Sequence, residues 1–242
     1  GANAVQYVAG EGELDCNRIA VVRGRVVDAQ GQALSGVRVW APASPGAGVS
    51  LTRLDGWFDF AVNGDGIVQV EFVKPGYLRA GRSSDLGSRE IRGLGDVTLL
   101  SRAPSATTVD LSAAIEMQVV RGSLETDPDG SRRGTVLFPL GTSAVAELPG
   151  GGTQSLTSLS VRAREYSVGP DPTANLPGAL PPGVSPIYVA DFSVDEAESA
   201  GATHVRFLFG LPFGAIALLV VGTIAGGLPE PNLASLGWTA FG

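Results

Sequence analysis

Apolar and polar positions alternate along the first hundred residues, in short runs separated by turn sequences. Residues 19–28 (IAVVRGRVVD) are rich in β-branched side chains and end at a turn. A period of two, interrupted by glycine, proline and aspartate, is typical of β-strands. Short strands at this spacing, within about 80 residues, are typical of a small β-sandwich. The predicted strands are residues 19–28, 37–41, 49–53, 57–62, 67–73 and 96–100.

The second half of the chain has the same pattern. A polar linker, SRAPSATT (101–108), precedes it, and its longest loop is residues 169–186. Residues 195–201 are predicted to form a short helix with Asp195 as N-cap and Gly201 as C-cap. The predicted strands here are residues 117–124, 132–139, 143–148, 158–168, 187–194 and 205–209.

These patterns predict an all-β chain of two consecutive β-sandwich domains, with turn-rich loops and an apolar C-terminal segment. Between 49–53 and 57–62, Asp55-Gly56 is a strong tight-turn signal and predicts a hairpin. The predicted division is an N-terminal arm (1–18), a first β-sandwich (19–100), the linker (101–108), a second β-rich domain (109–206) and an apolar tail (207–242).

The start of the tail, residues 207–228, contains no charged side chain and is long enough to span a bilayer. Two G-x-x-x-G spacings within it would allow close helix contacts in lipid. However, Pro212 and the glycines weaken a helix, and no basic cluster follows the segment. We favour a pair of buried strands with a turn at Gly222, and the alternative is a membrane span.

Composition excludes several classes of protein. Of 242 residues, 34 are glycine and 16 are proline, which excludes a coiled coil, and the glycines lack the three-residue period of collagen. Hydrophobic residues make up 44% and charged residues 17%, so the chain can form cores and is not a disordered tail. The net charge of −7 argues against a nucleic-acid partner.

Three segments of the first domain resemble the carboxypeptidase regulatory-like domain, which is a transthyretin-like β-sandwich. They are GQALSGVRVW (31–40), LTRLDGWFDFAV (51–62) and VEFVKPGYL (70–78). The resemblance covers residues 19–100. It implies that Leu34, Val37, Val39, Phe58 and Phe60 enter the core and that Gly36, Gly56 and Gly76 lie in turns.

The region after this domain resembles the corresponding part of very large secreted proteins of the Rhs/YD-repeat, teneurin-like type. The similar segments are residues 107–144, VRAREYSVGPDP (161–172) and ADFSVDEAESAGATHVRF (190–207). In that family, β-domains precede a long repeat shell. The 242 residues contain no YD repeats and no toxin domain, so the resemblance implies a structural segment.

The sequence offers no convincing catalytic, cofactor or metal site. His204 is the only histidine and no G-x-S-x-G motif accompanies it, so we expect a surface or strand histidine. Cys16 is the only cysteine, which excludes an intrachain disulfide, and its acidic neighbours disfavour a thiolate nucleophile. The glycine-rich PGGG (149–152) lacks the Lys-Ser/Thr of a phosphate loop.

Several carboxylates and two tryptophans could serve in binding or catalysis, but each also has a structural explanation. Asp127, Asp129 and Gly130 resemble the start of a calcium loop, but the glutamate at its twelfth place is absent, so we expect an ordinary turn. Asp191 and Asp195 could form a glycosidase pair, although Asp195 is better explained as a helix cap. Trp40 and Trp57 could stack on sugars, but we expect both to pack partly against the core.

These observations predict a non-enzymatic structural or interaction module of a secreted or cell-surface assembly, either part of an Rhs/teneurin-like protein or a filament or shell subunit. Its partners would be other protein subunits or the rest of a larger chain, with self-assembly possible through sheet edges and no cofactor required. The alternatives are a surface protein anchored in the membrane through residues 207–228 and a carbohydrate-binding module that uses Trp40 and Trp57.

Overall fold

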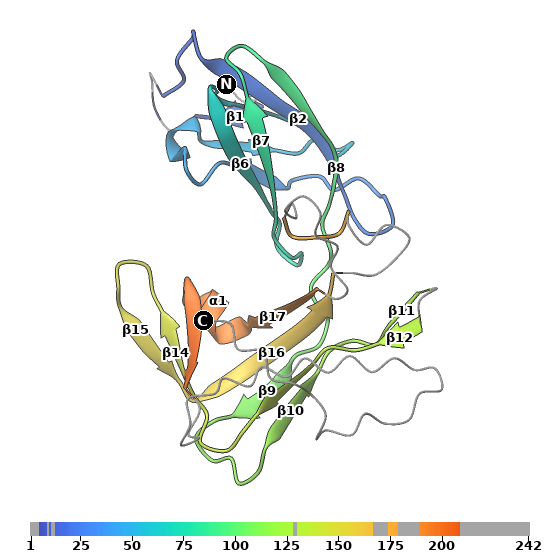
Figure 1. Ribbon diagram of the computed structural model, residues 1–242, viewed down its shortest axis with the longest axis vertical. Helices are drawn as coiled ribbons and strands as arrows, with labels where there is room; N and C mark the ends of the chain where they lie inside the picture. Colours follow the sequence, from blue (N-terminus) through green and yellow to red (C-terminus); the bar gives the residue numbers. More distant parts are fainter. Residues whose placement is uncertain are drawn as a thin grey trace. The chain divides into compact units, whose positions relative to one another are not determined.

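The computed structural model describes residues 5–8, 10, 13–127, 130–166, 174–178 and 189–208. The chain is all-β, as predicted. It divides into two compact units (Figure 1). The first unit contains residues 1–102 and 171–189, and the second contains residues 103–170 and 190–242. Each unit is therefore built from two separate parts of the sequence.

Two sheets form the first unit. The five-stranded sheet has the order β1-β4-β3-β6-β7, and the three-stranded sheet has the order β5-β2-β8 with β8 parallel to β2. A short 3₁₀ helix, η1 (Pro45–Ala47), precedes β4. The strands are β1 (Gln6–Tyr7), β2 (Ile19–Val27), β3 (Arg38–Trp40), β4 (Val49–Leu51), β5 (Trp57–Asn63), β6 (Gly66–Val73), β7 (Ala80–Leu86) and β8 (Ile91–Thr98).

The core of the first unit lies between these two sheets. The five side chains predicted from the family resemblance to enter it are buried, so that prediction is confirmed. The rings of Phe58 on β5 and Phe72 on β6 meet edge to face, with centroids 5.2 Å apart. Such a pair adds about 0.5–1.5 kcal/mol to the stabilisation from burial alone.

The Asp55-Gly56 turn forms as predicted, but the predicted hairpin is wrong. The strand before the turn, β4, belongs to the five-stranded sheet, and the strand after it, β5, belongs to the three-stranded sheet. The turn therefore carries the chain from one sheet to the other. Glycines 36, 56 and 76 all have positive φ angles, in agreement with their predicted turn positions.

The described part of the N-terminal arm lies within the first unit. Gln6 and Tyr7 pair with Ser50 and Val49 of β4. The Gln6 side chain donates to the carbonyls of Ala47 (2.6 Å) and Ala61 (2.8 Å) and accepts a hydrogen bond from the Ala61 amide. Because Ala61 is on β5, this one side chain links the two sheets.

The second unit has a separate core. It contains a β17-β16-β9 sheet, a β15-β14-β18 sheet and two small pairs, β10-β13 and β11-β12. Phe138 and Phe207 meet edge to face in this core at 5.7 Å. The strands are β9 (Thr107–Asp110), β10 (Gln118–Arg121), β11 (Glu125–Asp127), β12 (Gly130–Arg132), β13 (Thr135–Phe138), β14 (Ser143–Glu147), β15 (Thr153–Leu156), β16 (Ser158–Glu165), β17 (Ala190–Val194) and β18 (His204–Leu208).

The predicted helix exists as α1 (Asp195–Ser199), but Asp195 is not its N-cap. Val194 occupies that position without a capping hydrogen bond from its side chain. The Asp195 carboxylate instead accepts hydrogen bonds from Arg162 of β16, at 2.8–3.1 Å. The C-cap residue is Ala200, so Gly201 is not the C-cap as predicted; it follows one position later with a φ of +66°.

A cluster of buried charges connects three strands of the second unit. Arg132 donates to both carboxylate oxygens of Asp127 (2.8 and 2.7 Å) and to Glu165 (2.6 Å). The two carboxylates are almost completely buried. The hydrogen bonds that Arg132 donates to Asp127 raise the pKa of its guanidinium further. Arg132 thus joins the β11-β12 hairpin to β16.

Most of the predicted apolar segment, residues 209–228, lies outside the described residues. Within the described parts of the chain, no helix has the length and apolar character needed to cross a membrane.

Replacing Phe72 with alanine is expected to reduce the free energy of unfolding of the first unit by about 3–5 kcal/mol, because it leaves a cavity beside Phe58. Urea unfolding followed by tryptophan fluorescence, to which Trp40 and Trp57 contribute, measures the change. The control is Ile67→Ala, since Ile67 lies on the same strand, β6, and is 80% exposed. Its effect should stay within about 0.5 kcal/mol. Equal effects of the two variants would contradict the core assignment.

Replacing Arg132 with methionine removes the guanidinium that binds the buried carboxylates of Asp127 and Glu165. The second unit should lose about 3–5 kcal/mol of stability in urea unfolding monitored by far-UV circular dichroism. Arg206→Met is the matched control, because Arg206 pairs with Glu147 at 3.6 Å on the surface. That change should be smaller than about 1 kcal/mol. If Arg132→Met also cost less than about 1 kcal/mol, the buried cluster would not be stabilising the unit.

Candidate interaction surface

Thr52 fixes the start of the corner between the two sheets. Its hydroxyl donates to the carbonyl of Leu34 (2.6 Å) and accepts from the amide of Val37 (2.9 Å). The side chain is buried, so both hydrogen bonds are protected from water. The end of β4 is thereby tied to the turn that precedes β3.

The corner itself depends on Asp55 and Gly56. The Asp55 carboxylate accepts a hydrogen bond from the Trp57 amide at 3.1 Å, which is an Asx-type turn. Gly56 has a φ of +79°, and a Cβ at this position would lie 2.5 Å from the Val26 carbonyl oxygen. Any other residue would be strained there. Strand β5 therefore begins at a fixed point, with Phe58 facing the core and Trp57 facing outward.

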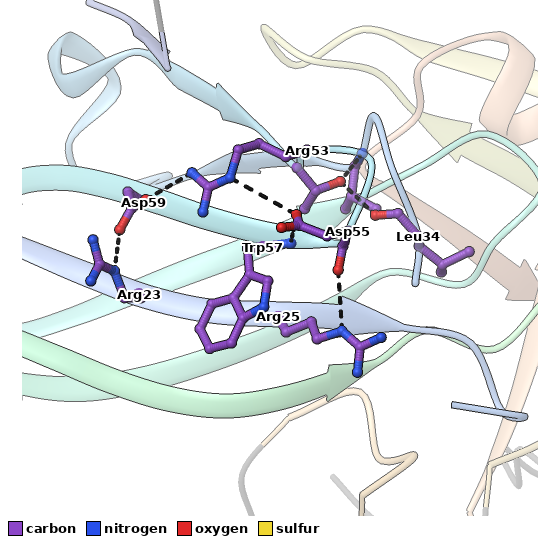
Figure 2. A network of polar contacts seen from close by, with 9 residues as sticks. Arg23, Arg25, Leu34, Arg53, Asp55, Trp57 and Asp59 are labelled. Atoms are coloured by element: carbon purple, nitrogen blue, oxygen red, sulfur yellow. Dashed lines mark hydrogen bonds and ion pairs between the residues drawn. The ribbon is translucent and has the colours of Figure 1, made fainter. Parts of the chain in front are cut away.

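An arginine–aspartate network surrounds Trp57 on the outer face of the three-stranded sheet (Figure 2). Arg23 and Arg53 both donate to the carboxylate of Asp59, and the Arg53 bond is 2.8 Å long. Arg53 also lies 3.9 Å from the Asp55 carboxylate. Burial alone raises the pKa of Asp59, but the hydrogen bonds from Arg53 and Arg23 outweigh this and hold it below its usual range.

Arg25 completes the network. Its Nε donates to the backbone carbonyl of Asp55 at 3.1 Å, and its guanidinium lies 3.8 Å from the carboxylate of Asp96 on β8. Arg25 is also the register partner of Trp57. The three arginines thus face three aspartates, and the surface has no excess charge with which to attract a polyanion.

Near the corner, two apolar side chains are exposed, Trp57 (41%) and Leu54 (91%). Tryptophan and arginine are enriched at the energetic centres of protein–protein interfaces. Hydrogen bonds already hold the arginines around Trp57, so less side-chain entropy would be lost on binding. We call Trp57, Leu54 and the network around them the Trp57 surface, and its chemistry fits another protein surface.

The structure does not bring Trp40 and Trp57 together. Trp40 lies on the outer face of the five-stranded sheet, where the Arg38 guanidinium is 5.0 Å from the centre of its ring. The outer faces of the two sheets point in opposite directions, so the two tryptophans cannot form one sugar-stacking platform. Trp57 is also more exposed than the predicted packing against the core would leave it.

The other polar residues considered from sequence lie apart. His204 is an exposed strand residue whose Nδ1 is 3.2 Å from the Thr203 hydroxyl, and Cys16 is exposed and free. Asp127 belongs to the buried charge cluster and Asp195 is bound to Arg162, whereas Asp129 lies outside the described residues. Over the described ranges, no three His, Cys, Asp or Glu side chains are grouped to hold a metal ion.

The network residues Arg23, Arg53 and Asp59 were not identified from the sequence. Alternation within the strands does place Arg23 and Asp59 on outer faces. Their proximity, however, depends on the register of β2 with β5, where Arg23 is opposite Asp59. The sequence pattern does not specify that register.

Comparison with known proteins agrees with the fold of the first unit. Residues 14–99 match the family model described as the teneurin TTR-like domain. This match supports a transthyretin-like domain similar to that of teneurins. The expected transthyretin-like fold is thereby supported, whereas the carboxypeptidase regulatory-like label and the Rhs/YD-repeat relationship stay predictions.

Three curated relatives of this chain bear teneurin names. The chain is 52% identical over 56 residues to Teneurin-m of Drosophila melanogaster, covering 23% of this chain and 2% of that protein. It is 31% identical over 111 residues to Teneurin-1 of Caenorhabditis elegans (40% of this chain, 4% of that protein). It is 31% identical over 78 residues to Teneurin-3 of Danio rerio, covering 32% of this chain and 3% of that protein. The chain thus spans only a few per cent of these relatives.

Solved structures add little to this comparison. The major pilin subunit BcpA of Bacillus cereus is 8% identical, with a TM-score of 0.27 over 89% of this chain and 61% of that chain. A 3-chlorocatechol 1,2-dioxygenase of Rhodococcus opacus 1CP is 14% identical, with a TM-score of 0.28. The match covers 35% of this chain and 60% of that chain. Similarity at this level carries no functional argument.

The lowered pKa of Asp59 makes a prediction about pH. A carboxylate whose pKa is lower in the folded state stabilises the protein above its unfolded pKa, and this contribution is lost as the pH falls through the folded value. The first unit should therefore lose stability below about pH 4 more steeply in the wild type than in Asp59→Asn. Urea unfolding at a series of pH values between 2 and 6 measures both slopes. Parallel slopes would show that Arg23 and Arg53 do not hold the Asp59 pKa down.

Proposed function

We propose that the chain is a non-enzymatic interaction module of a secreted or cell-surface protein, and that it is a segment of a much larger Rhs/teneurin-like chain. The match of residues 14–99 to the teneurin TTR-like domain is the observation that carries this proposal. The teneurins to which the chain is similar are far longer than 242 residues, which supports membership of a larger chain.

The geometry of the Trp57 surface supports binding to a protein. The Asx-type turn fixes the backbone of Trp57 at the start of β5, and the charged groups beside it are paired with one another. An aromatic group presented in this way gives a large apolar contact at small entropic cost. The paired charges at its edge would exclude water and fix the orientation of a partner.

Binding of the labelled chain to intact cells of its source organism tests the proposal. Binding should be saturable and should disappear after protease treatment of the cells. Trp57→Ala should weaken it about 30-fold, as expected for a central interface tryptophan worth about 2 kcal/mol. Flow cytometry over a range of chain concentrations measures the apparent dissociation constants.

The matched control is Ile67→Ala, which removes an 80%-exposed apolar side chain from a strand of the other sheet. It should leave the dissociation constant unchanged. Equal binding by Trp57→Ala and the wild type would contradict a role for the Trp57 surface. Binding that is abolished by glycosidases while the surface proteins remain intact would favour the carbohydrate-binding alternative.

A further inference from the structure

The β7 edge of the five-stranded sheet is covered by a segment from far along the sequence. Strand β7 is the last strand of that sheet and pairs with β6 on one side. Residues 174–178 (ANLPG), here called the covering segment, belong to the same unit. The Gly81 amide of β7 donates to the Pro177 carbonyl at 2.6 Å. Leu176 is only 3% exposed.

The guanidinium of Arg82, on β7, binds backbone carbonyls of the covering segment. The guanidinium Nη1 donates to the carbonyls of Leu176 (3.1 Å) and Gly81 (2.7 Å), and Nη2 donates to the carbonyl of Ala174 (3.2 Å). No carboxylate within the described residues forms an ion pair with Arg82. Burial lowers the pKa of this guanidinium, which indicates a charge partly withdrawn from water. Carbonyl oxygens therefore satisfy a cation that would otherwise be poorly solvated.

The covering segment accepts one backbone hydrogen bond from the seven-residue strand β7, at Gly81, so its removal would free the Gly81–Arg82 end of this edge. An exposed edge of this length presents unpaired N–H and C=O groups to other chains, and β7 contains no proline that would prevent pairing. A second copy of the same chain carries the same edge, so two such edges can pair with each other about a twofold axis.

We propose that residues 174–178 act as a displaceable cover, held by Arg82, that prevents β7 from pairing with β7 of a second copy of this chain. The cover acts within one molecule, so its effective concentration is in the millimolar range, above any usual protein concentration. The second copy gains access only when the contacts of Arg82 are lost. This role concerns a different sheet from the Trp57 surface and does not depend on the function proposed for it.

The test compares the full-length wild type with Arg82→Met, which keeps the apolar stem of the side chain and removes its donors. Hydrogen exchange at the Gly81 amide should accelerate at least tenfold, because its acceptor Pro177 is no longer held in place. Light scattering and sedimentation at increasing concentrations should show the variant associating to a dimer at concentrations where the wild type has the lower mass.

Two further variants keep the result interpretable. Arg79→Met makes the same charge change just before β7, at a side chain that is 69% exposed, and should behave as the wild type. Leu176→Ser alters only the covering segment and should reproduce both effects of Arg82→Met. Unchanged exchange at Gly81 in both Arg82→Met and Leu176→Ser would overturn the proposal, because the cover would then not depend on these contacts. Faster exchange without any increase in mass would overturn it too.

Discussion

The first unit depends on a corner that only glycine can form. A Cβ at position 56 would lie 2.5 Å from the Val26 carbonyl, and the backbone there has a positive φ. Because the chain turns at this point, β4 and β5 belong to opposite sheets while remaining adjacent in sequence. The alternation that follows then determines which side chains of β5 face the core and which face outward. Phe58 and Phe60 enter the core, and Trp57 and Asp59 face outward. The core and the candidate interaction surface are therefore two consequences of one turn.

The two units are stabilised in different ways. The first has three large aromatic side chains among its fully buried residues, Phe58, Phe60 and Phe72, and its charged pairs lie on the surface. The second unit instead has small sheets that are partly joined by the buried charges of Arg132, Asp127 and Glu165. A buried ion pair contributes less net stability than an apolar core of equal volume, but the loss of one partner is severe. The second unit should thus be the more sensitive to a single polar substitution.

The sequence predicted the core of the first unit well because strand alternation and turn glycines are local properties. The family resemblance, which rests on such local segments, placed Leu34, Val37 and Val39 in the core without any knowledge of long-range pairing. Strand β7 (AGRSSDL) was missed because it has few apolar residues, and its pairing with β6 rather than its own side chains makes it a strand. The same limit applies to Asp195, whose partner Arg162 lies 33 positions away. Helix capping is a local pattern, whereas an ion pair across a sheet is not.

The first unit extends beyond the segment that matches the teneurin TTR-like domain, residues 14–99. Its five-stranded sheet has two edges, and both are completed from outside that range. Gln6 and Tyr7 form β1 at one edge, and Pro177 accepts a hydrogen bond from β7 at the other. Open sheet edges favour association between chains, and an added strand or segment suppresses it. A fragment limited to residues 14–99 would retain the core of Phe58 and Phe72 but expose both edges. The boundaries needed for a monomeric domain are therefore set by edge coverage, whereas the family match covers only the segment that carries the core and the turns.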